Sequence, residues 1–84
     1  LERMVKLMIY CNLKESTPVS ATYYYGDTVS NLSGEFAVTR SLRLEVIKQP
    51  EKCGELTYWL GQLLYKYRND FANGKFREKI AYEC

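Results

Sequence analysis

The segment 55–71 constrains the fold more than any other part of this 84-residue chain. Its apolar residues recur at steps of three and four, which is the spacing of one face of an α-helix. The stripe consists of Leu56, Trp59, Leu60, Leu63, Leu64, Tyr67 and Phe71. Such a stripe has to be buried, so the remainder of the chain is expected to supply the surface that it covers.

The ends of this helix are marked by residues with known positional preferences. We expect it to begin between Pro50 and Glu55, because proline suits a first turn and an acidic side chain opposes the positive end of the helix dipole. It should end at Asn73 and Gly74, a pair typical of a left-handed helix terminus. Beyond that point Phe76 and Ile80 lie four residues apart, which predicts a short final helix to about residue 83.

Alternation of apolar and polar residues predicts strands before the helix. Residues 5–13 and 19–25 alternate cleanly, and Gly26 with Asp27 fits a tight turn with a positive φ at the glycine. Residues 35–48 keep their apolar side chains on even positions throughout, which favours one long or bulged strand. Two strands hinged near Arg40 and Ser41 are the alternative.

These elements predict an α+β fold: an N-terminal antiparallel sheet of three to four strands, covered on one face by a long C-terminal helix, plus a short final helix. The helix should pack on the strand face that carries Val5 and Leu7. Residues 4–84 are expected to form a single domain, with Met4 as the natural start and residues 1–3 as an expression remnant. The lack of a signal-like or membrane-spanning apolar run favours a cytoplasmic protein without a membrane partner.

The residue types argue against catalysis. The chain has no histidine, which removes the commonest general base and metal ligand at neutral pH. Its five glycines are singly placed, and its three cysteines are far apart, so neither a phosphate-binding loop nor a metal-ligand spacing is present. Cys53, near the expected helix start, has no histidine or second thiol to activate it. We therefore expect a non-enzymatic chain with reduced thiols and with no catalytic residue, cofactor or metal.

Large side chains on the other face of the predicted sheet suggest a contact surface. Met8, Tyr10 and Tyr24 project from the face that the helix leaves free, and tyrosine and methionine are enriched where proteins meet partners. Tyrosine is also simply a good strand residue, an explanation of about equal weight. The expected partner is another protein or a second copy of this chain.

A second functional interpretation uses the same face. Exposed aromatic rings can stack on nucleic-acid bases, and Arg43 and Lys48, with Lys6 and Arg40, could contact phosphates. The formal net charge of +2 and the lack of an RNA-recognition pattern make single-stranded nucleic acid the weaker alternative. The sequence thus favours a small protein-interaction module, of the inhibitor or adaptor type, whose partner-binding residues are Met8, Tyr10, Tyr24, Arg43 and Lys48.

Leu63 lies at the centre of the apolar stripe and provides a test of it. Leu63→Ala should lower the free energy of unfolding by about 2 to 5 kcal/mol, because it removes a buried side chain and leaves a cavity. Urea denaturation of the wild type and the variant measures this difference. A loss below about 0.5 kcal/mol, the size expected of a neutral surface change, would show that the buried face has been misassigned.

Overall fold

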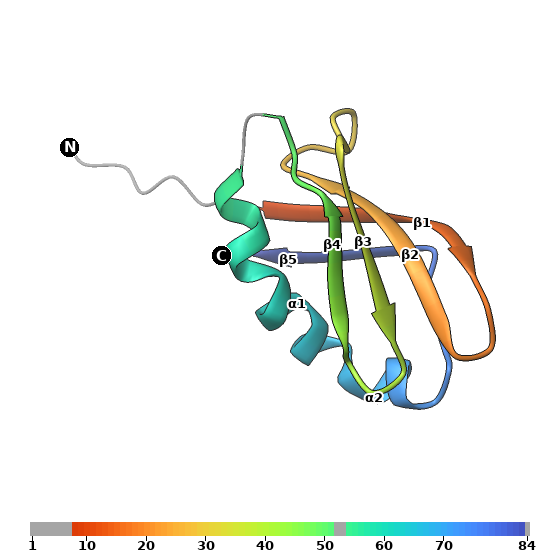
Figure 1. Cartoon of the computed structure of the whole chain (residues 1–84). Helices are drawn as coiled ribbons and strands as arrows, with labels where there is room; N and C mark the ends of the chain where they lie inside the picture. The colour runs from red at the N-terminus through yellow and green to blue at the C-terminus, as the bar shows by residue number, and fades with distance from the viewer. Residues whose placement is uncertain (1–7, 52–53, 84) are drawn as a thin grey trace.

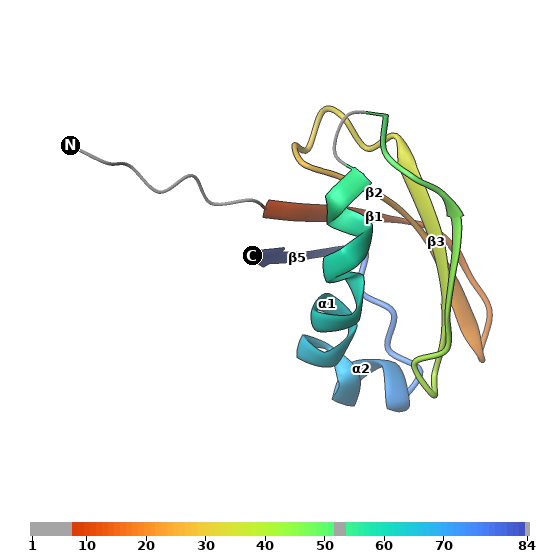
Figure 2. The same ribbon diagram turned by 60° about the vertical axis from the view of Figure 1, so that its left-hand side comes forward.

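A five-stranded antiparallel sheet dominates the computed structural model, which describes residues 8–51 and 54–83 (Figure 1). The strands are β1 Met8–Ser16, β2 Ser20–Gly26, β3 Gly34–Thr39, β4 Leu44–Lys48 and β5 Lys79–Glu83, and they lie in the order β4-β3-β2-β1-β5. Between β4 and β5 come the 3₁₀ helix η1 Gly54–Trp59 and the helices α1 Leu60–Lys66 and α2 Arg68–Ala72. Figures 1 and 2 show a strongly twisted sheet with these helices along one of its faces.

The expected long helix is wrong, because the helical segment is divided into three short pieces. It begins as the 3₁₀ helix η1, and it is interrupted at Tyr67, whose φ of −104° and ψ of 19° depart from α-helical values. The interruption redirects the chain between α1 and α2 (Figure 2). Leu64 and Phe71 are consequently both buried against a curved sheet, and a straight helix would diverge from such a sheet along its length.

The apolar stripe is buried except at its margin. Leu63 is fully buried, together with Leu56, Leu60 and Phe71, and Leu64 is buried as well. Trp59 is 36% exposed, so its assignment to the buried stripe was wrong. Adjacent helical residues point about 100° apart, so Trp59 lies beside the face that is centred on Leu60.

The predicted final helix is also wrong, because residues 79–83 form strand β5. This strand pairs antiparallel with β1, placing Ile80 opposite Cys11 and Tyr82 opposite Ile9, and thereby completes a sheet of five strands rather than three or four. A spacing of four residues fits a helix, but Ile80 and Tyr82 also alternate as strand residues do. The hydrogen bonds offered by the edge of β1 decide between the two in favour of the strand.

Residues 35–48 form a hairpin and not one strand. Leu42 N–H donates to Thr39 O over 3.0 Å, which closes the turn between β3 and β4, and Leu42 takes a left-handed φ of 67°. Phe36 pairs with Val46 and Val38 with Leu44, while Ala37 pairs with Glu45, so the opposed residues nearest the turn share the same parity. The even phase therefore persists through the turn, which is why periodicity could not separate a hairpin from one long strand.

The strand faces follow the alternation in β1 and β2. Ile9 and Cys11 face the helices and are buried with Tyr23 and Tyr25, whereas Val19, also expected on this face, is 63% exposed just before β2 begins. Val5, Leu7 and Cys53, the thiol that is expected to be unreactive, lie outside the described residues.

Gly26 is required by close backbone approach and not by its φ, which is not positive, contrary to expectation. A Cβ atom at this position would lie 1.9 Å from Asn31 O in the loop that follows β2. A Cβ on Gly61, by contrast, would meet no atom within 4 Å.

These two glycines predict opposite responses to the same substitution. Gly26→Ala should lower the free energy of unfolding by about 3 kcal/mol or more, because backbone atoms have to move to admit the methyl group. Gly61→Ala should raise it by about 1 kcal/mol, since alanine is the better helix former and the space around it is open. Urea denaturation of both variants at low protein concentration tests the pair; equal effects would contradict the backbone geometry at Gly26.

Candidate interaction surfaces

Three of the eight tyrosines hold the helical layer and the C-terminal segment to the sheet. The Tyr23 hydroxyl donates to Arg77 O at 2.7 Å, and the Tyr25 hydroxyl lies 2.7 Å from that of Thr57 in η1. The Tyr67 hydroxyl donates to Ala81 O and accepts from Ala81 N–H in β5, at 3.2 and 3.1 Å. These three residues are therefore committed to the fold and are not available to a partner.

Burial suppresses ionisation in the core of the sheet. Desolvation raises the pKa of Tyr23 above its ordinary value, and it also raises that of Tyr25, where the hydrogen bond with Thr57 partly opposes the effect. Burial likewise raises the pKa of the Cys11 thiol, which disfavours the reactive thiolate. None of these three buried groups, Tyr23, Tyr25 and Cys11, is therefore activated as a nucleophile.

The face of the sheet turned away from the helices, here called the open face, carries a polar row that crosses all five strands. Pairing in register sets five residues side by side: Lys79, Asn12, Tyr24, Glu35 and Lys48. Tyr24 is 38% exposed, and the Lys14 ammonium lies 5.6 Å from the centre of its ring and 2.9 Å from a Glu35 carboxylate oxygen. An aromatic ring thus lies among charges of both signs.

The register brings four of the five predicted contact residues to this face. Met8 and Tyr10 are half-buried and alternate with the buried residues of β1, so they share the face with Asn12 and hence with Tyr24. Lys48 joins them through its pairing with Glu35. Arg43 lies just before β4, where its N–H donates to the Thr39 hydroxyl, at the far end of the sheet.

Arg40 is engaged within the fold. Its Nε and Nη2 atoms donate to Ala72 O at 3.1 and 2.8 Å, so the guanidinium caps the last turn of α2 and opposes its negative dipole end. Its expected role in phosphate contact is not favoured by this geometry. Lys6 lies outside the described residues.

The most exposed aromatic side chains lie on the helical segment, and sequence reasoning overlooked them. Tyr58 is 87% exposed and Tyr65 58% exposed, and the half-covered Trp59 meets Tyr58 edge to face at 6.4 Å. The available signal was the seven-residue spacing of the two tyrosines, which lie off the apolar stripe and repeat on one helical face.

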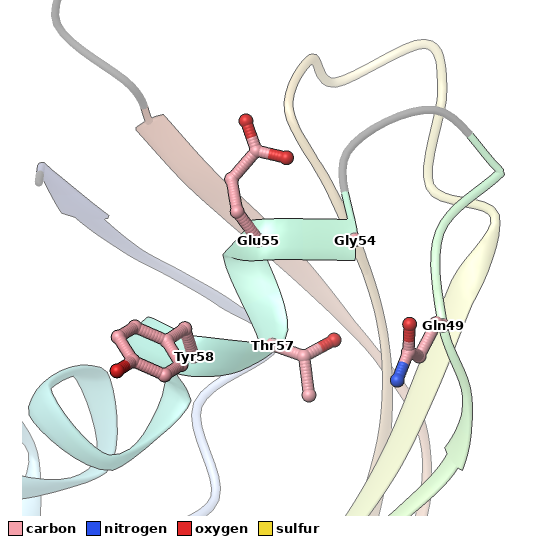
Figure 3. Close-up of a pocket in the computed structure, with 5 residues that line it drawn as sticks. All are labelled: Gln49, Gly54, Glu55, Thr57 and Tyr58. Carbon is pink, nitrogen blue, oxygen red and sulfur yellow. The ribbon is translucent and has the colours of Figure 1, made fainter.

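A hollow of about 540 Å³ lies between η1 and the end of β4 (Figure 3). Its lining residues are Gln49, Gly54, Glu55, Thr57 and Tyr58. Figure 3 shows Thr57 and Gln49 facing the gap, while the Glu55 carboxylate and the Tyr58 ring point away from it. In a small-molecule site several polar groups converge on the ligand. Here the Glu55 carboxylate and the Tyr58 hydroxyl point away from the hollow, so the hollow is not a built ligand site.

Comparison with known proteins gives no relative: no family model, curated protein or solved structure matches this chain. Among residues 8–51 and 54–83, no helix combines the length and apolar content that crossing a bilayer requires. In the same ranges, no three His, Cys, Asp or Glu side chains come together as ligands for a metal ion.

The raised pKa of Tyr23 predicts a loss of stability in alkali. The folded state disfavours the phenolate of Tyr23. The stability that the neutral side chain contributes is therefore fully present below the unfolded pKa of about 10 and is lost as pH rises toward the folded pKa. Urea denaturation across this range should show a falling free energy of unfolding. Tyr23→Phe should reduce the slope, at the cost of about 1 kcal/mol at neutral pH from the lost hydrogen bond. An unchanged slope would contradict the assignment.

Proposed function

We propose that the chain is a small non-catalytic protein-interaction module, of the inhibitor or adaptor type, that binds a protein partner through its open face. The observation that carries the proposal is that the helices pack on one face of the sheet, leaving Tyr24 exposed among charged side chains on the other. Amphipathic aromatic residues with a polar surround are typical of protein interfaces. A cytoplasmic location belongs to the same proposal, since three widely spaced cysteines suit a reducing compartment.

The charges of the open face favour a protein over nucleic acid. Lys14 is paired with Glu35, and Glu35 lies opposite Lys48 across the β3–β4 ladder. Glu45 adds a further carboxylate opposite Ala37. A phosphate backbone requires an excess of free cations, whereas mixed charges with an aromatic centre suit a protein surface.

The edges of the sheet favour binding through the face and not by strand addition. At the β5 edge, the Lys66 ammonium donates to Ala81 O at 2.9 Å, where the Tyr67 hydroxyl also bonds, so this backbone group is already occupied. At the other edge, β4 is five residues long, carries Glu45 and Lys48, and pairs irregularly near Glu35. Short length, charges and irregular pairing are the features that discourage the addition of another strand.

Removing two aromatic side chains from the open face should separate the two functional classes. We expect Tyr10→Ala with Tyr24→Ala to weaken capture of a partner from lysate by about tenfold or more while the melting curve stays near that of the wild type. Capture of a protein should resist nuclease and change little with salt. Tyr65→Ala, which removes an exposed tyrosine from the helical layer, is the matched control.

Nucleic acid would give the opposite pattern. The retained species would disappear on nuclease treatment and fall steeply with salt, because neutralised phosphates release counterions. Arg43→Ala or Lys48→Ala would then weaken binding to all sequences alike. That outcome would replace the protein-binding proposal with single-stranded nucleic-acid binding.

A further inference from the structure

The helical layer has a solvent-facing side, here called the outer helical face, whose members are all exposed: Glu55, Tyr58, Gly61, Gln62, Tyr65 and Arg68. Steps of three in η1 and of three or four in α1 bring side chains onto one side of a helix. Arg68 shares this side with Tyr65, because its guanidinium lies 4.0 Å from the centre of the Tyr65 ring. The consecutive helices η1 and α1 thus each present one exposed tyrosine, Tyr58 and Tyr65, to solvent.

The space between the two tyrosines is open. Gly61 lies between them in sequence, and a Cβ atom there would touch nothing within 4 Å. Glycine costs about 1 kcal/mol in a helix relative to alanine, and no close approach among the described residues explains its presence. A helix surface with glycine at its centre admits the close approach of another backbone.

The ends of the outer helical face carry opposite charges. Glu55 lies at its N-terminal end and Arg68 at its C-terminal end, with both side chains exposed. Lys66 does not add to the positive end, since its ammonium is turned toward β5 and bonds Ala81 O. The face therefore runs from acidic, through aromatic and glycine, to basic.

From this arrangement we infer that the outer helical face binds the same face of a second copy of the chain, with the two helical segments antiparallel about a two-fold axis. Residues equally far in sequence from the midpoint between Gly61 and Gln62 would then meet. Tyr58 would meet Tyr65 of the second copy, and Glu55 would meet Arg68 of the second copy. Each contact occurs twice, as a two-fold interface requires.

Charge complementarity selects a second copy as the occupant. A face that is acidic at one end and basic at the other matches its own reversed image, so antiparallel pairing places unlike charges together twice. The tyrosines flank the gap at Gly61, so the rings of each copy can pack beside the glycine of the other, and paired aromatic rings add to the energy of burial. This inference does not depend on the proposed function, because the open face lies on the other side of the sheet.

Gly61→Arg tests the inference without endangering the fold. The monomer has open space at this position and arginine is a good helix former, so the variant should melt no lower than the wild type. At the inferred interface, two bulky cations would face each other across the axis. Sedimentation velocity over a range of protein concentrations, with reductant present, should show reversible dimerisation of the wild type and at least about tenfold weaker association of the variant.

Charge reversal identifies the pairing. Glu55→Arg alone places two arginines together, and Arg68→Glu alone places two glutamates together, so each should weaken dimerisation. The double variant restores unlike pairs and should recover most of the lost affinity, as a double-mutant cycle measures. Tyr24→Ala, on the open face, is the control that should leave dimerisation unchanged.

The outcomes of these experiments either support or overturn the inferred dimer. A wild-type dimer that Gly61→Arg weakens, and that the double charge reversal restores relative to the single reversals, supports the inference. A wild type that stays monomeric at every concentration overturns it, as does a dimer that is indifferent to Gly61→Arg or that is lost in Tyr24→Ala. A monomeric wild type, or a dimer indifferent to Gly61→Arg, leaves the proposed capture of a protein partner through Tyr10 and Tyr24 standing, so the two proposals fail separately.

Discussion

The aromatic cluster around Tyr23 is the interaction on which the remaining structure depends. Its ring stacks on Phe36 of β3 with centroids 5.4 Å apart and lies 6.4 Å from Phe71 of α2, so one side chain joins the middle of the sheet to the helical layer. Its hydroxyl continues to Arg77 O in the segment that leads into β5. A chain of this length buries a small core, so a few large aromatic side chains that each join two elements supply much of its cohesion.

The same chemistry determines which tyrosines remain at the surface. Where a hydroxyl finds a partner within the fold, as in Tyr25 and Tyr67, the residue becomes a tie between layers. Tyr58 and Tyr65 instead stay exposed on the outer helical face, and their hydroxyls bond no other residue in the part of the chain that the structure describes. The high tyrosine content therefore has two physical explanations, one in the core and one at the surface, and they apply to different residues.

The two surfaces have different chemical characters, and they lie on opposite sides of the sheet. The open face surrounds Tyr24 with Lys14, Glu35 and Lys48, a mixture of charges around one exposed ring. The outer helical face separates its charges to its two ends, and its centre holds two tyrosines with a single glycine, Gly61, between them. Mixed charge suits recognition of a different protein, whereas separated charge suits pairing with a reversed copy. A dimer formed through the helices would leave both open faces accessible.

The sequence by itself determined the features that rest on local periodicity and residue type. Strict alternation placed Ile9, Cys11, Tyr23 and Tyr25 on the helix-facing side of β1 and β2, and steps of three and four marked Leu60, Leu63 and Leu64 for burial. Alternation also placed Met8, Tyr10 and Tyr24 together on the other face, because side chains of a strand point to opposite sides in turn.

Only the tertiary structure decided the features that depend on partners distant in the chain. Residues 79–83 became a strand because β1 offered an unpaired edge, and residues 35–48 became a hairpin although a continuous strand has the same parity. The roles of individual tyrosines were set by groups 54 residues away for Tyr23 and 32 residues away for Tyr25. Local sequence records which side of an element is apolar, but where a hydroxyl or a strand edge finds its hydrogen bond is decided by the packing of the whole chain.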